Sequence, residues 1–384
     1  MAGRLQRGAD AGPAGPHQRS PDGHDPQGRG GRRPGRHRRL RRHVLGGQES
    51  QVKALQTSPL FLDGDLVDAL ASVEVGLDAA RVSAGAAAVT GRVQIGDGHT
   101  WMRVLAGILP EIGIVGYKEF HRVGQRVRYH ISVFDRDSAD MIGIVDGRRV
   151  TSLRTASTAA LCFEHADDGR PKKLAVIGSG EEAKEGLRAV AAVSTLAEVA
   201  VFSPTPANRE AFCDALGPAV GVPVYPVDSV DAALAGARQS YVATSSVGPA
   251  FLEARQVAHL QLLAGIGSTR PDQRELIGDV FTAASQVVFD CADARHEPGD
   301  VIDAVERFGF DPAGAVLLRD WLRSPYQPVG EGPVVFKSIG TVEQDLALAH
   351  RLLVAAHEHQ LGIPAPEIGS LRIMRDPEAE RKGP

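Results

Sequence analysis

Cysteine and aromatic residues are scarce in this sequence, and it has no long apolar run. The three cysteines, Cys162, Cys213 and Cys291, lie far apart and match no metal-ligand spacing, which is typical of a reduced, cytoplasmic protein. No segment approaches the roughly 20 apolar residues of a transmembrane helix, so we expect no membrane contact. The net charge of -4 gives no general attraction to nucleic acid, and we expect the folded part to bind none.

The first 43 residues contain neither Lys nor Glu and are rich in Arg, Gly, Pro and His. Such a segment has too little apolar surface to offset its chain entropy, so residues 1–54 are expected to form a disordered basic tail. A nucleic-acid-binding arm and a transit peptide are the functional alternatives. We favour a dispensable tail, beginning at a start codon placed too early, because the segment has no aromatic residues for stacking on bases. It also lacks the apolar core of a secretory signal.

With 384 residues, of which 43% are hydrophobic, the chain is long enough for two domains with sizeable cores. The first is predicted at residues 55–168. An amphipathic pattern over residues 64–84 predicts a helix, and Thr151 opens an Ala-rich helix that ends near His165. Between them, apolar runs separated by turn residues predict strands at 99–106, 112–120, 127–134 and 141–150.

A different rhythm, in which strands and helices alternate, fills the second predicted domain at residues 169–334. Its apolar strands are predicted at 174–179, 198–203, 222–227, 240–245, 262–267 and 287–291. This alternation predicts a parallel sheet with helices on both faces. A long amphipathic helix then follows, and we expect residues 335–370 to return to the first domain, before a C-terminal tail at 371–384. The predicted fold class is α/β: a Rossmann-type doubly wound parallel sheet plus a discontinuous α+β domain.

A glycine turn after the first of these strands carries the strongest functional signal. Gly178-Ser179-Gly180-Glu181-Glu182-Ala183 is a G-x-G-x-x-A motif between a strand and a helix, the setting that a nicotinamide dinucleotide site requires. Gly178 allows the tight turn, Gly180 leaves room for the diphosphate, and Ala183 lets helix and strand pack closely. The helix start then attracts the negative charge, provided that Glu181 and Glu182 point away. The alternative is a plain turn that uses glycine for its shape alone.

The end of the second strand of this domain bears on the choice between the two nicotinamide cofactors. A carboxylate there would bind the ribose 2′-hydroxyl of NAD and repel a 2′-phosphate. The chain instead has Ser203 and Thr205 with Arg209 a few residues later, and hydroxyl and guanidinium groups suit a phosphate. We therefore expect NADP(H) in preference to NAD(H). The alternative for Arg209 is a solvent-facing position on a helix.

Two further polar loops follow strands of this sheet. Thr244 and Ser245 come after one strand, and Gly267 and Ser268 come after the next. Both loops lie at the carboxyl edge of the sheet, where ligands bind in such folds, so we count them as cofactor candidates, although Gly and Ser are also ordinary turn residues. Lys337 is either close to the cofactor or paired with a carboxylate.

Three basic residues of the first domain lie in or beside apolar segments, namely Arg92, Lys118 and Arg154. A buried cation has to be paired, solvated or holding an anion. Taken singly, each is best explained as a paired or partly exposed residue. Taken together, they are suited to clamp a substrate carboxylate, with arginine giving a two-pronged grip.

Over residues 91–362 the sequence resembles the ornithine cyclodeaminase/mu-crystallin family. The segments that carry the resemblance are Gly116-Tyr117-Lys118, Thr151-Ser152-Leu153-Arg154-Thr155-Ala156, the glycine turn from Ile177 to Ala183, Gly265-Ile266-Gly267-Ser268-Thr269-Arg270-Pro271 with Glu275-Leu276, and Val335-Phe336-Lys337-Ser338-Ile339-Gly340 with Asp345. They occur in the family's order and spacing.

The resemblance implies a homodimer whose first domain binds substrate and forms the dimer contact, while the Rossmann domain holds NAD(H) or NADP(H). Members act on small amino or imino acids. By the same resemblance, Arg92, Lys118 and Arg154 hold the substrate carboxylate, and Lys118 also polarises the reacting carbon–nitrogen unit.

Two departures from the family pattern affect the expected chemistry. Where ornithine cyclodeaminase has an acid–base aspartate, this chain has Thr269, which cannot take up a proton at neutral pH as a carboxylate does. The surrounding run is similar to the mu-crystallin branch, which reduces cyclic ketimines. His130 stands where the family has a carboxylate-contacting threonine, and we count it, with Lys118 and Thr269, as a catalytic candidate. A histidine satisfied within its strand is the alternative for His130.

The sequence therefore predicts an NAD(P)H-dependent reductase of a small imino acid, for which a cyclic substrate is expected. One alternative is ornithine cyclodeaminase, which converts ornithine to proline and ammonia with catalytic NAD. Another is a non-catalytic protein that binds NADPH or a small ligand. No metal is expected, because His357 and His359 alternate on a helix and so point to different faces.

Overall fold

A computed structural model describes residues 58–245, 248–327, 330–366 and 369–372. The predicted basic tail at 1–54 lies outside the described residues, as does nearly all of the predicted tail at 371–384. Among the described residues, no helix has the length and apolar character needed to cross a membrane. The three cysteines are free thiols.

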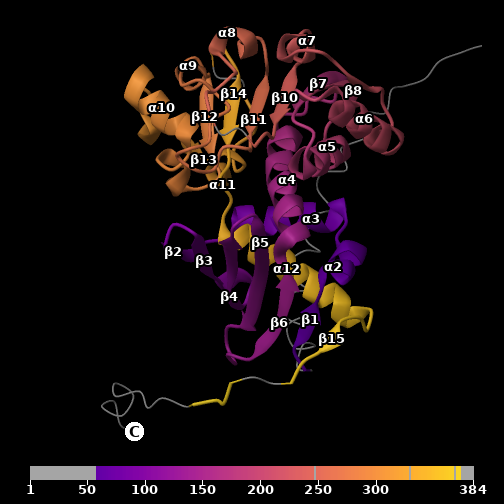
Figure 1. Cartoon of the computed structure of the whole chain (residues 1–384), viewed down its shortest axis with the longest axis vertical. Coiled ribbons are helices and arrows are strands. Elements are labelled where there is room, and N and C mark those ends of the chain that lie inside the picture. Colours follow the sequence, from indigo (N-terminus) through magenta and orange to yellow (C-terminus); the bar gives the residue numbers. More distant parts are fainter. Residues whose placement is uncertain (1–57, 246–247, 328–329, 367–368, 373–384) are drawn as a thin grey trace, which may run out of the picture. The chain divides into compact units, whose positions relative to one another are not determined.

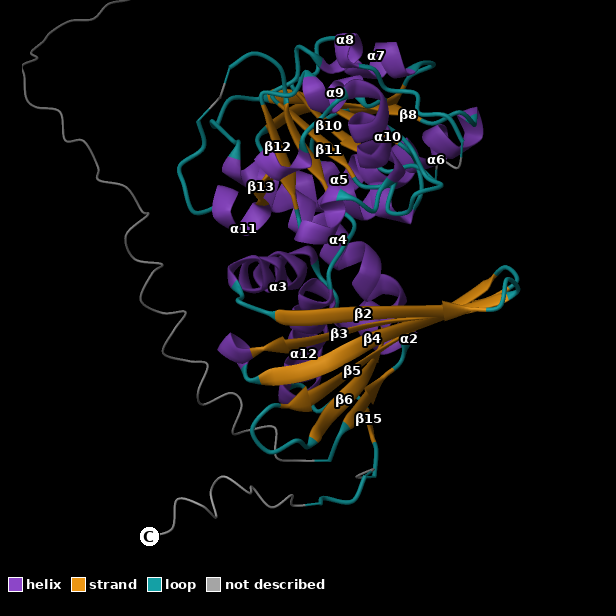
Figure 2. Ribbon diagram, turned by 90° about the vertical axis from the view of Figure 1, so that its left-hand side faces the viewer, coloured by secondary structure: helices purple, strands orange, loops and turns teal. Residues whose placement is uncertain are grey.

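The first lobe is built on a seven-stranded sheet in the order β15-β1-β6-β5-β4-β3-β2. Its strands are β1 (Leu60–Leu62), β2 (Val89–Gly96), β3 (Thr100–Leu109), β4 (Ile114–Val123), β5 (Arg126–Asp135), β6 (Met141–Asp146) and β15 (Ile363–Pro364). Each consecutive pair from β2 to β6 is antiparallel, whereas β1 runs parallel to β6. Figure 2 shows β2 to β5 as long neighbouring arrows.

Four helices accompany this sheet: α2 (Gly64–Leu70), α3 (Val73–Gly85), α4 (Gly147–His165) and α12 (Val342–Glu358). Helix α12, yellow in Figure 1, comes from the far end of the chain and packs against β3, β4, β5 and β6. Two glycines make the approach close. A Cβ atom on Gly107 would lie 2.7 Å from Val342 Cγ1, and one on Gly116 would lie 2.7 Å from Leu346 Cδ2. The predicted return of the C-terminal helix to the first sheet is confirmed by these contacts.

The pleat of this sheet sorts its side chains onto two faces. In register, Lys118 of β4 lies opposite Leu105 of β3, which lies opposite Arg92 of β2, so all three point to the face that α12 covers. The opposite face carries exposed apolar side chains, including Val89, Val93 and Ile95 of β2, Ile108 of β3, Tyr117 of β4 and Ile363 of β15. We call these six residues, which lie on four strands, the open face.

The second lobe contains an eight-stranded sheet in the order β13-β12-β14-β11-β10-β7-β8-β9, in which all paired strands run parallel. Its strands are β7 (Lys172–Ile177), β8 (Leu196–Phe202), β9 (Val224–Pro226), β10 (Gln239–Val242), β11 (Leu262–Gly265), β12 (Gln286–Phe289), β13 (Val316–Leu317) and β14 (Val334–Lys337). The order reverses at β7, which lies between β8 and β10. Ligands bind at such a switch point, beyond the carboxyl ends of the strands.

Helices cover both faces of this sheet, as the alternating pattern predicts. Residues of α4, α5 (Glu181–Val193), α6 (Pro206–Val220) and α11 (Leu318–Trp321) form one core. Residues of α7 (Val230–Leu234), α8 (Ala254–Val257), α9 (Asp279–Thr282) and α10 (Gly299–Phe308) form the other. The α/β fold class is therefore confirmed.

Three boundaries differ from the sequence-based expectations. The helix predicted over 64–84 is two helices, because Ser72 caps the start of α3 through its hydroxyl. Helix α4 begins at Gly147 rather than Thr151, because Asp146 accepts a hydrogen bond from Arg148 N. Strand β2 was not predicted, although Val89, Val93 and Ile95 alternate with polar residues along it, and its residues are exposed.

Strand β14 also departs from the predicted division of the chain. Residues 335–337 were expected to belong to the first domain, but β14 pairs with β11 and β12 in the eight-stranded sheet. The chain therefore leaves the second lobe after Lys337 and starts α12 at Val342.

Candidate active site

A cavity of about 1640 Å³ is lined by the α12-facing side of β2 to β5 and by the carboxyl edge of the eight-stranded sheet. Its wall includes the glycine turn after β7, the loops after β8, β10 and β11, and the start of α4. The structure thus brings the predicted cofactor turn and the predicted carboxylate-binding cations Arg92, Lys118 and Arg154 to one cavity.

The glycine turn has the geometry that its sequence predicts. Gly178 has φ +119°, and a Cβ there would lie 2.1 Å from the Ala243 carbonyl oxygen, whereas a Cβ on Gly180 would meet nothing within 4 Å. Gly180 therefore faces open space in the cavity wall, and Ala183 is buried against the sheet. The two acidic residues of the turn do not point out of the cavity, as the prediction required, because both line it; Glu181 contacts Lys184 Nζ at 2.8 Å and Glu182 contacts Ser152 Oγ at 2.8 Å.

One buried carboxylate, not singled out from the sequence, holds the next two loops together. Glu275 accepts hydrogen bonds from Thr244 N at 2.6 Å and Thr244 Oγ1 at 2.8 Å, and from Gly267 N at 2.8 Å. Burial raises the pKa of Glu275 to about 7. Thr244, Ser245 and Gly267 line the cavity, as the cofactor assignment expects.

Ser268 and Lys337 are not among the residues that line the cavity. Ser268 is buried and donates to the Gln273 carbonyl at 2.6 Å. Lys337 is fully buried, and its Nζ lies 2.8 Å from Asp300 Oδ2. Lys337 was predicted to lie near the cofactor or to pair with a carboxylate, and in the structure it pairs with a carboxylate.

The loop after β8 differs in part from the expectation. Ser203 lines the cavity and accepts a hydrogen bond from Ser179 Oγ at 2.9 Å. Arg209 is buried and turns away, because it donates to the Ser203 carbonyl and forms an ion pair with Asp228. Neither Thr205 nor Arg209 lines the cavity. Asn208, which was not predicted as a site residue, lines the cavity.

The centre of the cavity wall is a buried ion cluster. Lys118 Nζ lies 2.9 Å from Asp345 Oδ1 and 2.8 Å from Thr151 Oγ1. Arg154 shares the same carboxylate, with Nε 3.2 Å from Asp345 Oδ1, and donates to Gln344 at 2.9 Å. These two cations share one anion at hydrogen-bond distance, and a second buried carboxylate, that of Glu182, also interacts electrostatically with both of them. Burial lowers the pKa of Lys118 to about 8, although Asp345 opposes the shift.

The position of Arg154 depends on a close approach by the chain. Gly340 has φ +81°, and a Cβ there would lie 2.1 Å from Arg154 Nη1. Asp290 fixes this stretch by accepting from Gly340 N at 2.7 Å and Ser338 Oγ at 2.7 Å. The segment that joins β14 to α12 therefore approaches the Arg154 guanidinium so closely at Gly340 that a side chain there would clash with it.

Arg92 is held differently from the other two cations. Its Nη1 lies 2.6 Å from Glu297 Oε2, and its Nη2 lies 2.8 Å from Asp293 Oδ2. Both acids belong to the second lobe, so this ion pair ties the edge strand β2 to it. As predicted for each cation taken singly, Arg92 is paired.

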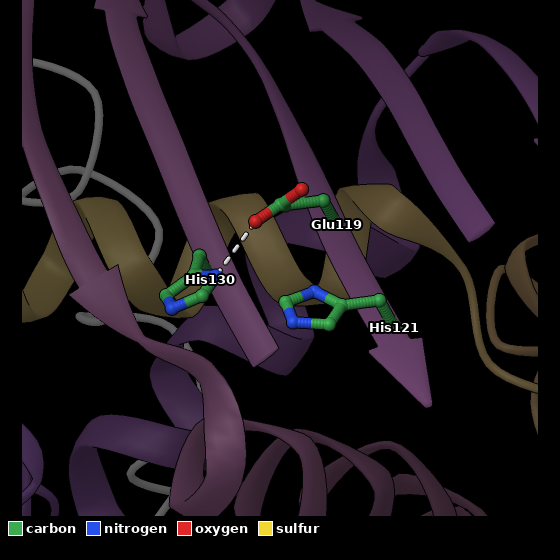
Figure 3. Close-up of side chains that lie close together, drawn as sticks. All are labelled: Glu119, His121 and His130. Carbon is green, nitrogen blue, oxygen red and sulfur yellow. Dashed lines mark hydrogen bonds and ion pairs between the residues drawn. The ribbon is translucent and has the colours of Figure 1, made fainter. Parts of the chain in front are cut away.

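The structure corrects the placement of His130. Its register partner is Glu119, whereas Lys118 pairs with Ile131, so the pleat turns His130 to the face opposite Lys118. His130 Nδ1 lies 2.7 Å from Glu119 Oε1, and His121 stands beside them (Figure 3). Tyr129, one residue earlier, lines the cavity instead, with Lys118 Nζ 5.5 Å from its ring centroid.

Ligand atoms of Glu119, His121 and His130 lie within 4.8 Å of one another. They are the one group of potential metal ligands among the described residues, and this group was not predicted from the sequence. Arg128 is the register partner of His121 and brings a positive charge to the same face, which disfavours a cation there.

Thr269 lines the cavity, and its backbone N–H donates to Gln273 Oε1 at 3.1 Å. Thr269 thus brings no carboxylate to this point of the wall; the carboxylate of this loop that lines the cavity is that of Asp272, which pairs with Arg270.

Comparison with known proteins identifies the family to which this chain belongs. The model of the ornithine cyclodeaminase/mu-crystallin family matches residues 116–351. The chain belongs to this family. Among curated relatives, Delta(1)-pyrroline-2-carboxylate reductase 2 of Burkholderia ambifaria is 31% identical over 224 residues, covering 56% of this chain and 67% of that protein. Ketimine reductase mu-crystallin of Rattus norvegicus is 26% identical over 225 residues, covering 57% and 66%.

Solved structures of the family share the fold. The chain matches the Delta(1)-pyrroline-2-carboxylate reductase of Thermococcus litoralis, solved with NADH and L-proline, with a TM-score of 0.73 and 19% identity over 80% of this chain and all of that one. It matches the iminosuccinate reductase of Paracoccus denitrificans, solved with NAD⁺, with a TM-score of 0.73 and 21% identity over 82% and 100%.

The open space at Gly180 generates a first prediction. We expect Gly180→Ala to fold normally, because its Cβ meets no protein atom, and to weaken NADPH binding by about tenfold or more, because the methyl group occupies the place of the diphosphate. Fluorescence titration with NADPH measures the effect. Gly217→Ala, on α6 and equally free of contacts, is the matched control. Equal affinities for the two variants would contradict the assignment.

A second prediction concerns the shared carboxylate. Asp345→Asn leaves Lys118 and Arg154 without their buried counter-charge, so we expect the free energy of unfolding to fall by roughly 3–5 kcal/mol. Urea unfolding followed by circular dichroism measures the loss. Asp320→Asn, which removes an exposed partner of Arg323, should change it by less than about 1 kcal/mol. A small loss for Asp345→Asn would show that the cluster does not stabilise the fold.

Proposed function

We propose that this protein is an NAD(P)H-dependent reductase of a small imino acid. The observation that carries the proposal is the meeting, in one cavity, of a dinucleotide-type glycine turn with the ion cluster of Lys118, Arg154 and Asp345. The relatives named as pyrroline-2-carboxylate and ketimine reductases support the same reaction class.

The residues present fit a dinucleotide. Gly180 leaves an open place at the start of α5, whose N–H groups favour a diphosphate. Ser203 and Asn208 line the cavity after β8, and neither carries a charge that would repel a 2′-phosphate, so NADPH is proposed as the preferred form and NADH as the alternative. When bound, the reduced nicotinamide supplies a hydride to the carbon of the C=N bond.

The chain's own residues orient the substrate and supply a proton. The cations of the Lys118–Arg154–Asp345 cluster bind the substrate carboxylate and draw electrons from the neighbouring C=N carbon. Protonated Lys118 donates a proton to the nitrogen, so that C=N becomes CH–NH with one hydride and one proton added. Phe120 and Tyr129 contribute apolar surface to the cavity wall beside this centre.

Ornithine cyclodeamination is the second candidate, and Thr269 argues against it. Threonine offers no carboxylate for acid–base work on an amine. Simple storage or transport of a ligand is a third candidate. A lysine with a pKa brought down to about 8 beside a cofactor turn favours turnover, because such shifts are typical of proton-transfer groups.

The central test follows cofactor absorbance with a panel of cyclic and linear imino acids. We expect stoichiometric consumption of NADPH with at least one of them, and faster turnover with NADPH than with NADH. Ammonia release from ornithine without net change in the cofactor would establish the cyclodeaminase instead. Binding of NADPH without turnover of any imino acid would establish the third candidate.

Lys118 gives a sharper prediction within this assay. If its ammonium donates the proton, kcat/KM for reduction is highest while Lys118 is charged and falls as the pH rises through about 8. Lys118→Met should lose about 100-fold or more in kcat and keep its NADPH affinity. A variant that retains the wild-type rate and pH profile would remove Lys118 from the mechanism.

We further propose that the protein is a homodimer formed through the open face. Val89 and Ile95 are 64% and 65% exposed, and Tyr117 is 37% exposed. An apolar patch spread over the neighbouring strands β2, β3 and β4 is unusual for a monomer, and a second copy supplies the same apolar chemistry through an isologous contact. The three free cysteines support a location in the reducing cytoplasm.

The dimer is tested by light scattering on the purified chain. We expect twice the chain mass for the wild type and a monomer for the double variant Val93→Lys with Tyr117→Lys, because two buried charges destabilise an apolar contact. Val305→Lys, which changes an exposed apolar residue of α10, should remain dimeric. A monomeric wild type at micromolar concentration would refute the assembly.

A further inference from the structure

The cations in the cavity wall differ in how their charge is matched. Lys118 and Arg154 share Asp345, Arg92 contacts Glu297 and Asp293, and Arg270 pairs with Asp272. Arg103 and Arg122 form no ion pair with any described residue. Arg122 Nε donates to the Gly124 carbonyl at 2.6 Å, at the hairpin end of β4.

Arg103 is the one of these two whose register row lies nearer to that of Lys118. It is half-buried on β3, and its Nε donates to Gln94 Oε1 at 2.8 Å. That bond uses one of the five N–H donors of a guanidinium. Among the described residues, nothing bonds the donors on Nη1 and Nη2, so the fork that suits a carboxylate is unused.

The register places this fork beside the proposed substrate site. Arg103 pairs with Gln94 and Phe120, and Leu105 pairs with Arg92 and Lys118. The two rows are two residues apart on one face, a separation of about 7 Å along the strands. The Phe120 ring is close to both cations, with Lys118 Nζ 5.7 Å and Arg103 Cζ 5.9 Å from its centroid.

The surroundings of Arg103 disfavour its positive charge, and a bound anion would stabilise that charge. Burial and the charges of Arg92 and Arg270 lower the pKa of its guanidinium, and Glu297 opposes this only in part. The carboxylate of Glu297 is bonded to Arg92. A cation with free donors among other cations is suited to hold an anionic ligand.

We propose that Arg103, oriented by Gln94, is a specificity-determining residue that binds a second carboxylate, at the end of the substrate's side chain. The inference rests on the proposed reductase function and narrows its substrate class to dicarboxylic imino acids. The first carboxylate lies at Lys118 and Arg154, the side chain passes the Phe120 ring, and the second carboxylate meets the Arg103 fork. The reaction is unchanged: hydride from the cofactor adds to the imine carbon, a proton adds to nitrogen, and both carboxylates remain intact.

The test compares imino acids formed in solution from ammonium with oxaloacetate or with pyruvate, and adds Delta(1)-pyrroline-2-carboxylate as a cyclic monocarboxylate. Omitting ammonium measures any reduction of the oxo acids themselves. NADPH consumption is followed for the full-length wild type, Arg103→Gln and Arg103→Lys. Arg136→Gln, which removes an exposed arginine of the β5–β6 loop, is the matched control.

We expect the wild type to prefer the dicarboxylic imine. Arg103→Gln should lose about 10- to 100-fold in kcat/KM for it, mainly through KM, and stay within about twofold of the wild type on the monocarboxylic imines. Arg103→Lys should recover part of the loss, because lysine keeps the charge but not the fork. Arg136→Gln should match the wild type.

Other outcomes separate the two proposals. Equal losses on all imines would make Arg103 structural, and a raised KM for NADPH alone would assign the fork to a cofactor phosphate; each overturns the inference. Efficient reduction of monocarboxylic imines alone, unaffected by Arg103→Gln, overturns it while leaving the reductase intact. Reduction of no imine by the wild type overturns the proposed function itself.

Discussion

The buried carboxylate of Asp345 is the constraint on which the rest of the site depends. It is fully buried on α12 and lies against two cations, one from β4 and one from α4. Because an unpaired charge is costly in such surroundings, the three elements have to meet in this arrangement. Asp345 by itself matches only one of the two cations, and the second carboxylate that interacts with both is that of Glu182, whose pKa is raised by burial.

Buried carboxylates also hold together the loops that form the opposite wall of the cavity. Glu275 accepts from the loops after β10 and β11, and Asp300 in turn accepts from Glu275 N at 2.6 Å. Asp290 does the same for the chain between β14 and α12. These side chains meet backbone donors that the strand ends leave unpaired, and so fix loops that have no regular structure of their own.

The sequence predicts the parts of this site that depend on local chemistry. The G-x-G-x-x-A turn needs a positive φ at Gly178 and free space at Gly180, and both are found. The pattern of parallel strands places Thr244, Ser245 and Gly267 at the correct edge. Lys118 and Arg154 were singled out as cations in or beside apolar segments, and the family resemblance supported the carboxylate-binding role proposed for them, whereas strand periodicity alone would not have joined residues on different elements.

What the sequence could not show are pairings between distant segments. Arg209 finds Asp228, and Lys337 finds Asp300, so two cations assigned to the cofactor are used inside the protein. His130 was expected in the substrate site, but it lies on the other face of the sheet, because successive residues of a strand point to opposite faces. Tyr129 is the residue that this pleat directs inward.

Strand β14 has a consequence for how the molecule is made. It inserts between β11 and β12, although about 45 residues separate it from β12 along the chain. During synthesis the nascent eight-stranded sheet is therefore split in two, with β12 and β13 unable to join β11, until residue 337 has left the ribosome. The segment that closes this gap leads directly into α12, so completing the second sheet and covering the first become successive steps of one late event.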